Sequence, residues 1–234
     1  MTRLLGLATL SLALVVATMP PASAQEVTAS PIEKIKSEAD MSIAQRLDTI
    51  TELQEVVETS EYLSGPHAAV LLDDLSSTRT GLESLGSLIQ EADTLEALLD
   101  LVPKIATDHR VYLVLVPKTF EVLGSDVISA VTVEMVRIES DVDAAIQAVA
   151  ATGFDTANVQ DTFDAAVANR ALAHDLAAPV AELVIDLSAA DWPDPARSTL
   201  ASGRESLVDA HHAARAAATG YQETIAELRR LIRS

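Results

Sequence analysis

The sequence predicts an all-α protein, an elongated antiparallel helical bundle with long, coiled-coil-like helices, and three observations support this. Apolar residues recur at spacings of three and four rather than two along most of the chain, which is the period of amphipathic helices. Glycine and proline separate these apolar runs and so mark their ends. The last segment, 196–233, repeats apolar or small residues every seven positions over more than four heptads, as helices that pack side by side do. We expect about five or six helices.

Composition limits the classes of function. The chain has 234 residues, of which 49% are hydrophobic, and it has no cysteine. One domain accounts for this length, and disulfides, zinc–thiolate sites, iron–sulfur sites and cysteine nucleophiles are excluded. Sixteen basic residues against 35 acidic ones give a net charge of −19. This deficit argues against nucleic acid as a partner, because phosphate contacts need clustered lysine and arginine.

A signal peptide is predicted at residues 1–24. Arg3 supplies a positive start, Leu4–Val16 forms an apolar stretch, and Ala22-Ser23-Ala24 is the small-x-small pattern that a signal peptidase cleaves. We therefore expect the protein to be exported.

Removal of this segment would leave a single all-helical domain, 25–234, with a charge of −20, because only one charged residue is lost. We expect this domain to be secreted or extracytoplasmic, in solution or associated with the cell wall, with no membrane span. The alternative is an apolar stretch retained as an anchor. It is disfavoured because Pro20 and Pro21 end a stretch shorter than the roughly 20 residues of a span.

Three helices are predicted in the first half of the chain. The first carries an apolar stripe formed by Ile43, Leu47, Ile50, Leu53 and Val57. Ser64 is expected to cap the second helix, with Pro66 in its first turn. The third begins at Asp93 or Thr94, and Pro103 should kink or divide it.

Two long helices are predicted next. The first begins near Pro117 and ends at Gly153, a residue suited to a left-handed stop. Its apolar face is expected to comprise Phe120, Leu123, Val127, Val131, Met135, Ile138, Val142, Ile146 and Val149. The second bends at Pro179 and ends before the linker 191–195, because the two prolines of this linker forbid a continuous helix.

The final helix has the most regular period in the sequence. Two interleaved sets recur seven apart, namely Leu200, Leu207, Ala214, Tyr221 and Leu228, and Gly203, Ala210, Ala217, Thr224 and Leu231. The small residues in its middle leave room for a neighbouring helix to approach closely. Residues 196–234 hold six basic and four acidic side chains, so this is the cationic part of an acidic chain. The repeat pairs either within one chain or with a partner.

The most unusual segment is His109–Lys118, in which six apolar residues lie between basic ones. Its pattern is neither helical nor alternating, and Pro117 biases the preceding residue toward an extended backbone. One interpretation is a buried junction between two helices, with Arg110 and Lys118 at its polar ends. The other is a small anion-binding pocket lined by Arg110, Tyr112 and Lys118 at the start of the next helix.

Trp192, the single tryptophan, is the remaining candidate for a ligand or contact site. It lies in the proline-containing linker and is expected to cover the end of the core. An exposed Trp192 would instead indicate a contact site.

Familiar catalytic and cofactor motifs do not occur in the sequence. Gly-x-Ser-x-Gly, Ser-x-x-Lys, Walker and calcium-loop patterns are all missing. Asp209 and His212 form one pair at i, i+3 that could supply two metal ligands, but the paired Glu-x-x-His motifs of di-iron bundles are absent. We therefore expect no catalytic residue, no metal and no cofactor.

The segment Arg110–Lys118, the stretch Leu187–Trp192 and the Ala/Arg-rich final helix resemble an uncharacterised group of exported helical proteins from high-GC Gram-positive bacteria. Proteins of this group begin with a signal peptide and carry a similar segment, Arg-Val-Tyr-x-Leu-Val-x-Pro-Lys, between long helices. The resemblance implies export and a helical architecture, and it implies no reaction. Pro103 departs from the unbroken helix expected for the group.

Three functional hypotheses follow. The leading one is an exported, non-catalytic structural or interaction module that binds a protein partner or a second copy of itself, because helix-pairing surface is abundant and catalytic motifs are missing. The first alternative is an extracytoplasmic carrier of an apolar or anionic small ligand, with a pocket near Arg110 to Lys118. The second is a cell-envelope hydrolase, which requires a polar cleft that joins an acidic residue with His174 or His211.

Overall fold

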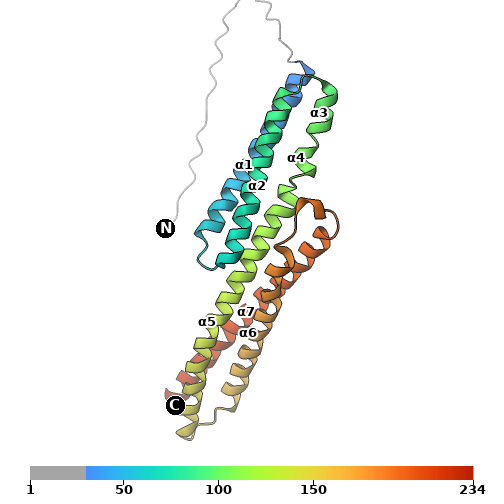
Figure 1. Cartoon of the computed structure of the whole chain (residues 1–234). Helices are drawn as coiled ribbons and strands as arrows, with labels where there is room; N and C mark the ends of the chain where they lie inside the picture. Colours follow the sequence, from blue (N-terminus) through green and yellow to red (C-terminus); the bar gives the residue numbers. More distant parts are fainter. Residues whose placement is uncertain (1–29, 234) are drawn as a thin grey trace, which may run out of the picture.

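The computed structural model describes residues 30–233, which contain no strand, so the all-α prediction is confirmed (Figure 1). The elements in order are α1 (Pro31–Thr59), α2 (Gly65–Glu91), α3 (Leu95–Leu101), α4 (Lys104–Thr107), the π-helical turn η1 (Val111–Leu115), α5 (Val116–Ala151), α6 (Ala157–Val184), the 3-10 turn η2 (Ala189–Asp191) and α7 (Ala196–Arg233). The signal peptide predicted at 1–24 lies outside the described residues.

The helices lie in two overlapping groups along one direction (Figure 1). α1 pairs with α2 beside the first part of α5, whereas α5, α6 and α7 pack against one another and continue beyond that pair. One apolar core lies among α1, α2, η1 and the neighbouring parts of α5–α7, and a second lies among the distal parts of α5–α7. None of the helices among residues 30–233 is both long enough and apolar enough to cross a bilayer.

Helix ends follow the turn residues that predicted them. The side chain of Ser64 caps α2 by accepting a hydrogen bond from the backbone N–H of His67 at 3.3 Å. Pro103 separates α3 from α4, and α5 ends two residues before Gly153, whose φ is +93°.

The heptad repeat of α7 packs within the chain. Its larger residues Leu200, Tyr221 and Leu228 are buried and Leu207 is half-buried. Its small residues Gly203, Ala210 and Ala217 are buried as well. This burial removes the main reason to expect self-association through the repeat.

The apolar face predicted for α5 is correct toward the end of the helix and wrong near its start, and the predicted Ile138 between these parts is 44% exposed. Val142, Ile146 and Val149 are buried as predicted, but the side chain of Phe120 is 52% exposed. The proximal half instead buries a polar face, formed by Lys118, Thr119, Glu121, Ser125 and Thr132. Hydrogen bonds explain most of this burial: the hydroxyl of Ser125, for example, donates to the carbonyl of Ala177 on α6 at 2.8 Å.

Two polar clusters tie α5 to its neighbours. In the first, His67 of α2 lies between two carboxylates. Its Nδ1 is 2.8 Å from Asp126 of α5, and its Nε2 is 3.3 Å from Glu182 of α6. Burial by itself lowers the pKa of His67, but hydrogen bonds and charge from the two carboxylates raise the pKa above its ordinary value.

The second cluster joins α5, α6 and α7. Arg170 donates to Glu139 at 2.8 Å, and the hydroxyl of Tyr221 donates to the same carboxylate at 2.5 Å. Burial and the neighbouring Glu139 together raise the pKa of Tyr221 well above its ordinary range. This cluster therefore links α5, α6 and α7 beside the second apolar core, to which Tyr221 belongs.

Candidate functional site

The segment His109–Lys118 is a helical junction, and the extended backbone expected before Pro117 does not occur. Val116 has right-handed helical angles, φ −61° and ψ −56°, and its N–H donates to the carbonyl of Val111. This is the wide turn of a π-helix, a feature frequent at functional sites. It leads directly into α5 and leaves Pro117 in the first turn of that helix, where the missing N–H removes no needed hydrogen bond.

Arg110 and Lys118 hold this junction against the segment that follows α6. Arg110 has left-handed backbone angles, φ 39° and ψ 41°, and its Nε donates to the carbonyl of Ala189 at 3.1 Å. Lys118 is 3% exposed, donates to the carbonyl of Leu187 at 2.8 Å and forms an ion pair with Asp74 of α2. Both cations are thus engaged in contacts that match the junction interpretation.

Tyr112 contacts α1, whereas Arg110 and Lys118 bond to the segment that follows α6. The hydroxyl of Tyr112 donates to the carbonyl of Gln45 at 3.4 Å, and the guanidinium of Arg46 lies 5.3 Å from the centre of its ring. The structure therefore does not bring Arg110, Tyr112 and Lys118 together in one pocket.

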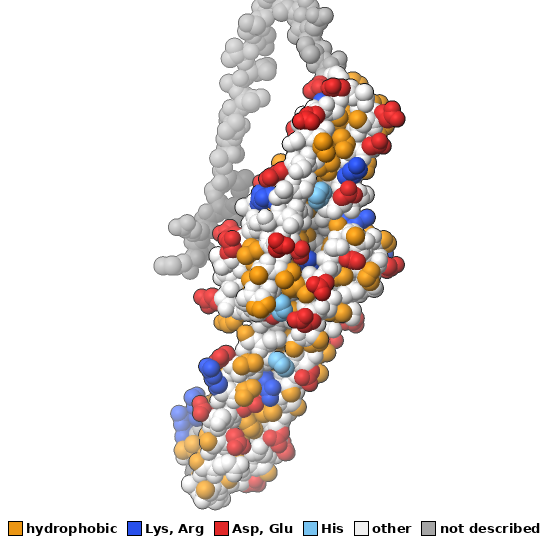
Figure 2. Space-filling view, in the orientation of Figure 1, with side chains coloured by type: hydrophobic (Ala, Val, Ile, Leu, Met, Phe, Trp, Pro, Cys, Tyr) orange, Lys and Arg blue, Asp and Glu red, His pale blue; other side chains and the backbone are white. Residues whose placement is uncertain are grey.

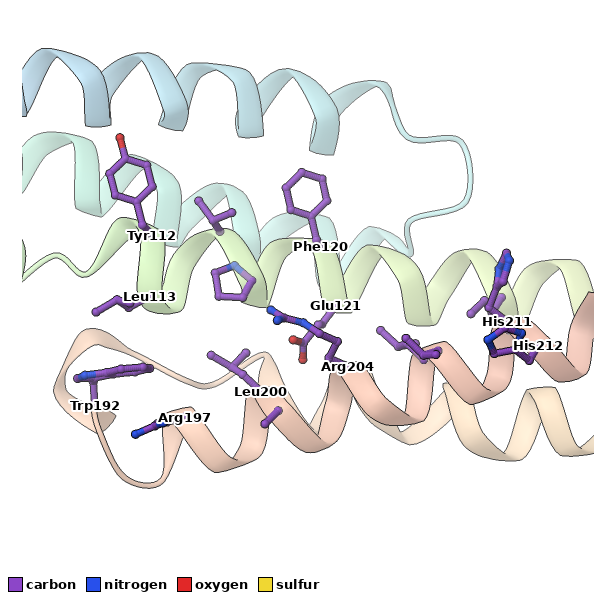
Figure 3. Close-up of a pocket in the computed structure, with 16 residues that line it drawn as sticks. Tyr112, Leu113, Phe120, Glu121, Trp192, Arg197, Leu200, Arg204, His211 and His212 are labelled. Carbon is purple, nitrogen blue, oxygen red and sulfur yellow. The ribbon is translucent and has the colours of Figure 1, made fainter.

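Tyr112 and Trp192 instead line one groove, which runs between η1 with the start of α5 on one side and the first half of α7 on the other (Figure 3). We call it the α5–α7 groove. Its volume is about 770 Å³, within the range of small-molecule sites. Its apolar wall includes Leu113, Val116, Phe120, Leu200, Leu207 and Val208.

Trp192 closes one end of this groove. Its side chain is half-buried and packs against the first apolar core, as expected of a residue that covers the end of the core. One face of the indole therefore contributes to the core while the residue also lines the groove.

Glu121 is the unusual residue of the α5–α7 groove. It lines the groove and is only 4% exposed, and neither of its carboxylate oxygens has a hydrogen-bond partner among the described residues. Burial raises its pKa to about 7, although the charge of Arg204 opposes that rise. Near neutral pH the carboxyl group is therefore able either to donate a hydrogen bond or to carry a negative charge.

Four basic or titratable side chains of α7 line the same groove: Arg197, Arg204, His211 and His212. Both arginines are exposed, and no ion pair joins either to a carboxylate among residues 30–233. Acidic side chains are spread over the face seen in Figure 2. Figure 3 shows Arg204 beside Glu121, across the groove from α5.

Gly203 allows α7 to approach Glu121 closely. A Cβ atom at this position would lie 2.5 Å from Oε2 of Glu121 and 3.2 Å from Cγ1 of Val180 on α6. Since real Cβ atoms do not approach other atoms so closely, the small residue is required by this placement of the carboxylate.

Glu121 and His211, an acid and a histidine of the kind that the hydrolase hypothesis requires, both line the groove but lie apart along it (Figure 3). The residues that line it include no serine or threonine. Within the described part of the chain, no group of three or more histidine or acidic residues is placed to hold a metal ion. The lining of the groove is thus mostly apolar, with one carboxyl group and four basic or titratable side chains.

No family model, curated protein or solved structure matches the chain. The resemblance to exported actinobacterial proteins therefore stays a prediction.

Sequence reasoning missed Glu121, Arg197 and Arg204. One signal was available for Glu121: it is the single ionisable residue between Lys118 and Asp126, within an otherwise apolar and small run. A helical period assigned the buried face to the neighbouring Phe120 instead, which placed Glu121 on the solvent side.

Proposed function

We propose that this protein is an exported carrier that binds a small, largely apolar molecule in the α5–α7 groove. This is the carrier predicted from the sequence, except that its ligand lies on the α7 side of the junction His109–Lys118 rather than among Arg110, Tyr112 and Lys118. The observation that carries the proposal is a groove of about 770 Å³ with a buried carboxyl group that lacks a hydrogen-bond partner among the described residues.

The unpaired carboxyl group of Glu121 and the exposed rings that line the groove indicate a ligand site rather than a packing defect. Polar side chains buried in proteins are almost always hydrogen-bonded, and the cost of leaving one unpaired is about 1–3 kcal/mol. Glu121 has no such bond, whereas Ser125 one turn later on the same helix makes one with α6. A ligand with a polar head and an apolar body would satisfy Glu121 and cover the exposed rings of Tyr112 and Phe120.

The leading hypothesis of the sequence, a module that binds a protein partner, is the second candidate. Exposed apolar side chains favour it: Tyr112, Leu113, Phe120 and Val208 are each more than 40% exposed along the groove. A partner helix laid in the groove would cover this surface. A partner helix would, however, bury the unpaired carboxyl group of Glu121 still more deeply. The carrier therefore explains one observation that the interaction module does not, namely this unpaired carboxyl group.

Trp192 provides a direct assay, because it is the single tryptophan and lines the groove. Titration with Nile red, a neutral apolar dye, should change the emission of Trp192 and transfer energy from the indole to the dye. Ala201→Phe should weaken dye binding about tenfold or more, because Ala201 is an exposed groove residue and a larger side chain there fills the cavity.

The matched control is Ala226→Phe, at another exposed alanine of α7 outside the groove. Dye binding that is equal in both variants, or undetectable in the wild type, would contradict the carrier. A stable complex of this chain with a second protein, blocked by Ala201→Phe, would favour the interaction module instead.

A further inference from the structure

The charges along the α5–α7 groove distinguish between ligand classes. On the side of α6, the apolar side chains of Val180 and Val184 pack at Gly203 beside the carboxylate of Glu121. The charge that faces the carboxylate comes from α7, where Arg204 is the nearest cation. Arg197 lies toward Trp192, while His211 and His212 line the other end (Figure 3).

A cationic head group is disfavoured by this arrangement. Only one acidic residue lines the groove, against two arginines and two histidines. An amine placed on Glu121 would lie close to the guanidinium of Arg204, and like charges at such distances repel. A ligand carboxylate experiences the opposite field, because both arginines attract it and neither is neutralised by a salt bridge within the described residues.

The protonated form of Glu121 completes the site for an anion. A neutral carboxyl donates one strong hydrogen bond to a carboxylate oxygen, and such charge-assisted bonds are about twice as strong as neutral ones. The ligand oxygen would thereby satisfy the buried group that the protein leaves unpaired. Glutamine is the closest isostere that also donates a hydrogen bond but cannot ionise.

The apolar wall continues along α7 and fits an extended chain. Arg197 and His212 are fifteen residues apart on α7, or about 22 Å at 1.5 Å per residue. Leu200, Leu207 and Val208 line the groove between them, opposite Val116 and Phe120. The groove thus combines an apolar track with a cationic side.

Resting on the proposed carrier function, we infer that the ligand of the α5–α7 groove is an amphipathic anion, an alkyl chain that ends in a carboxylate. The carboxylate is held by Arg204 and accepts a hydrogen bond from protonated Glu121, and the chain lies along the apolar wall.

The test compares three probes with the same tail and different heads: dodecanoate, 1-dodecanol and dodecyltrimethylammonium, each below its micelle-forming concentration. Binding is followed by the emission of Trp192. We expect dodecanoate to bind about tenfold more tightly than dodecanol, as one charge-assisted interaction provides, and the ammonium probe to bind least. Arg204→Gln should abolish the preference for dodecanoate and leave dodecanol binding unchanged, whereas Arg229→Gln, the same change elsewhere on α7, should do neither.

The role of Glu121 is tested by pH. In a variant with His211→Gln and His212→Gln, Glu121 is the one group of the groove lining that titrates between pH 6 and 8. Dodecanoate should bind more weakly at pH 8 than at pH 6, because ionised Glu121 repels the carboxylate. Adding Glu121→Gln should remove this difference while retaining tight binding at both pH values.

The outcomes separate the inference from the function on which it rests. Equal binding of all three probes would keep the carrier and overturn the anionic ligand. Tightest binding of the ammonium probe, lost in Glu121→Gln, would assign the groove to a cation and also overturn the inference. Failure of all three probes and of Nile red to bind would contradict the carrier function itself.

Discussion

Replacing Glu121 by glutamine should remove a pH dependence from the stability of the fold. Burial raises the pKa of Glu121 from an ordinary value of 4.5 to about 7 in the folded chain. Between these two pH values the folded state holds a proton that the unfolded state releases, so the free energy of unfolding falls as pH rises. Above pH 7 both states are ionised and the loss is complete.

The magnitude follows from the pKa change. At about 1.4 kcal/mol per pKa unit, raising the pKa from 4.5 to about 7 corresponds to a loss of about 3 kcal/mol. The groove is open to solvent, which screens the charge, so we expect about 1–3 kcal/mol.

The assay is urea denaturation at intervals from pH 4.5 to 8, for the wild type and for Glu121→Gln. The difference in unfolding free energy, wild type minus variant, should fall through this range and then level off. Subtraction cancels the titration of all other groups. The control is Asp143→Asn, which removes an exposed carboxylate from the same helix and should show no such fall. Parallel curves for the wild type and Glu121→Gln would refute the reasoning.

Three further predictions concern neighbouring contacts. Gly203→Ala should push the carboxylate of Glu121 into the groove, because the new Cβ would lie 2.5 Å from Oε2, and the pH-dependent loss of stability should shrink in the same urea series. In thermal denaturation, His67→Gln should cost stability at pH 6 and little at pH 8.5. The pKa of His67 is raised in the folded chain, so its contribution to stability is complete below pH 6.5 and is lost as pH rises through the folded-state pKa. An equal cost at both pH values would contradict this. Asp74→Asn should destabilise the chain by about 2 kcal/mol because Lys118 stays buried without its ion-pair partner, and a change below about 0.5 kcal/mol in urea would show that the pair contributes nothing.

The helix ends were predictable because they depend on local chemistry. Ser64, Pro103 and Gly153 act on the backbone within a turn of themselves, through a side-chain cap, a missing N–H and a left-handed conformation. The last helix, 196–233, was predictable because a repeat sustained over more than four heptads leaves little ambiguity about its face.

The junction shows where a local rule fails. Pro117 biases its predecessor toward an extended backbone, yet Val116 is helical because the π turn before it feeds directly into α5. The bias of one residue is smaller than the stabilisation from burying Val111, Val114 and Leu115 in the core.

The site was harder to predict because it depends on which polar residues find partners in three dimensions. A helical period identifies two opposite faces of α5 and favours the more apolar one, which includes Phe120. The structure buries the other face because Lys118 and Ser125 find hydrogen-bond or ion-pair partners in segments about 45 to 70 residues away along the chain. Glu121 is buried with them, and its sequence neighbours do not reveal this.

Photo-crosslinking tests the central claim, that the α5–α7 groove holds a small amphipathic ligand, most directly. Dodecanoate with a diazirine in its alkyl chain is irradiated with the full protein, and the labelled peptides are identified by mass spectrometry. We predict adducts on residues 112–128 and 197–212 that excess dodecanoate suppresses and Ala201→Phe reduces. Adducts confined to other surfaces, or labelling that unlabelled dodecanoate does not suppress, would contradict the claim.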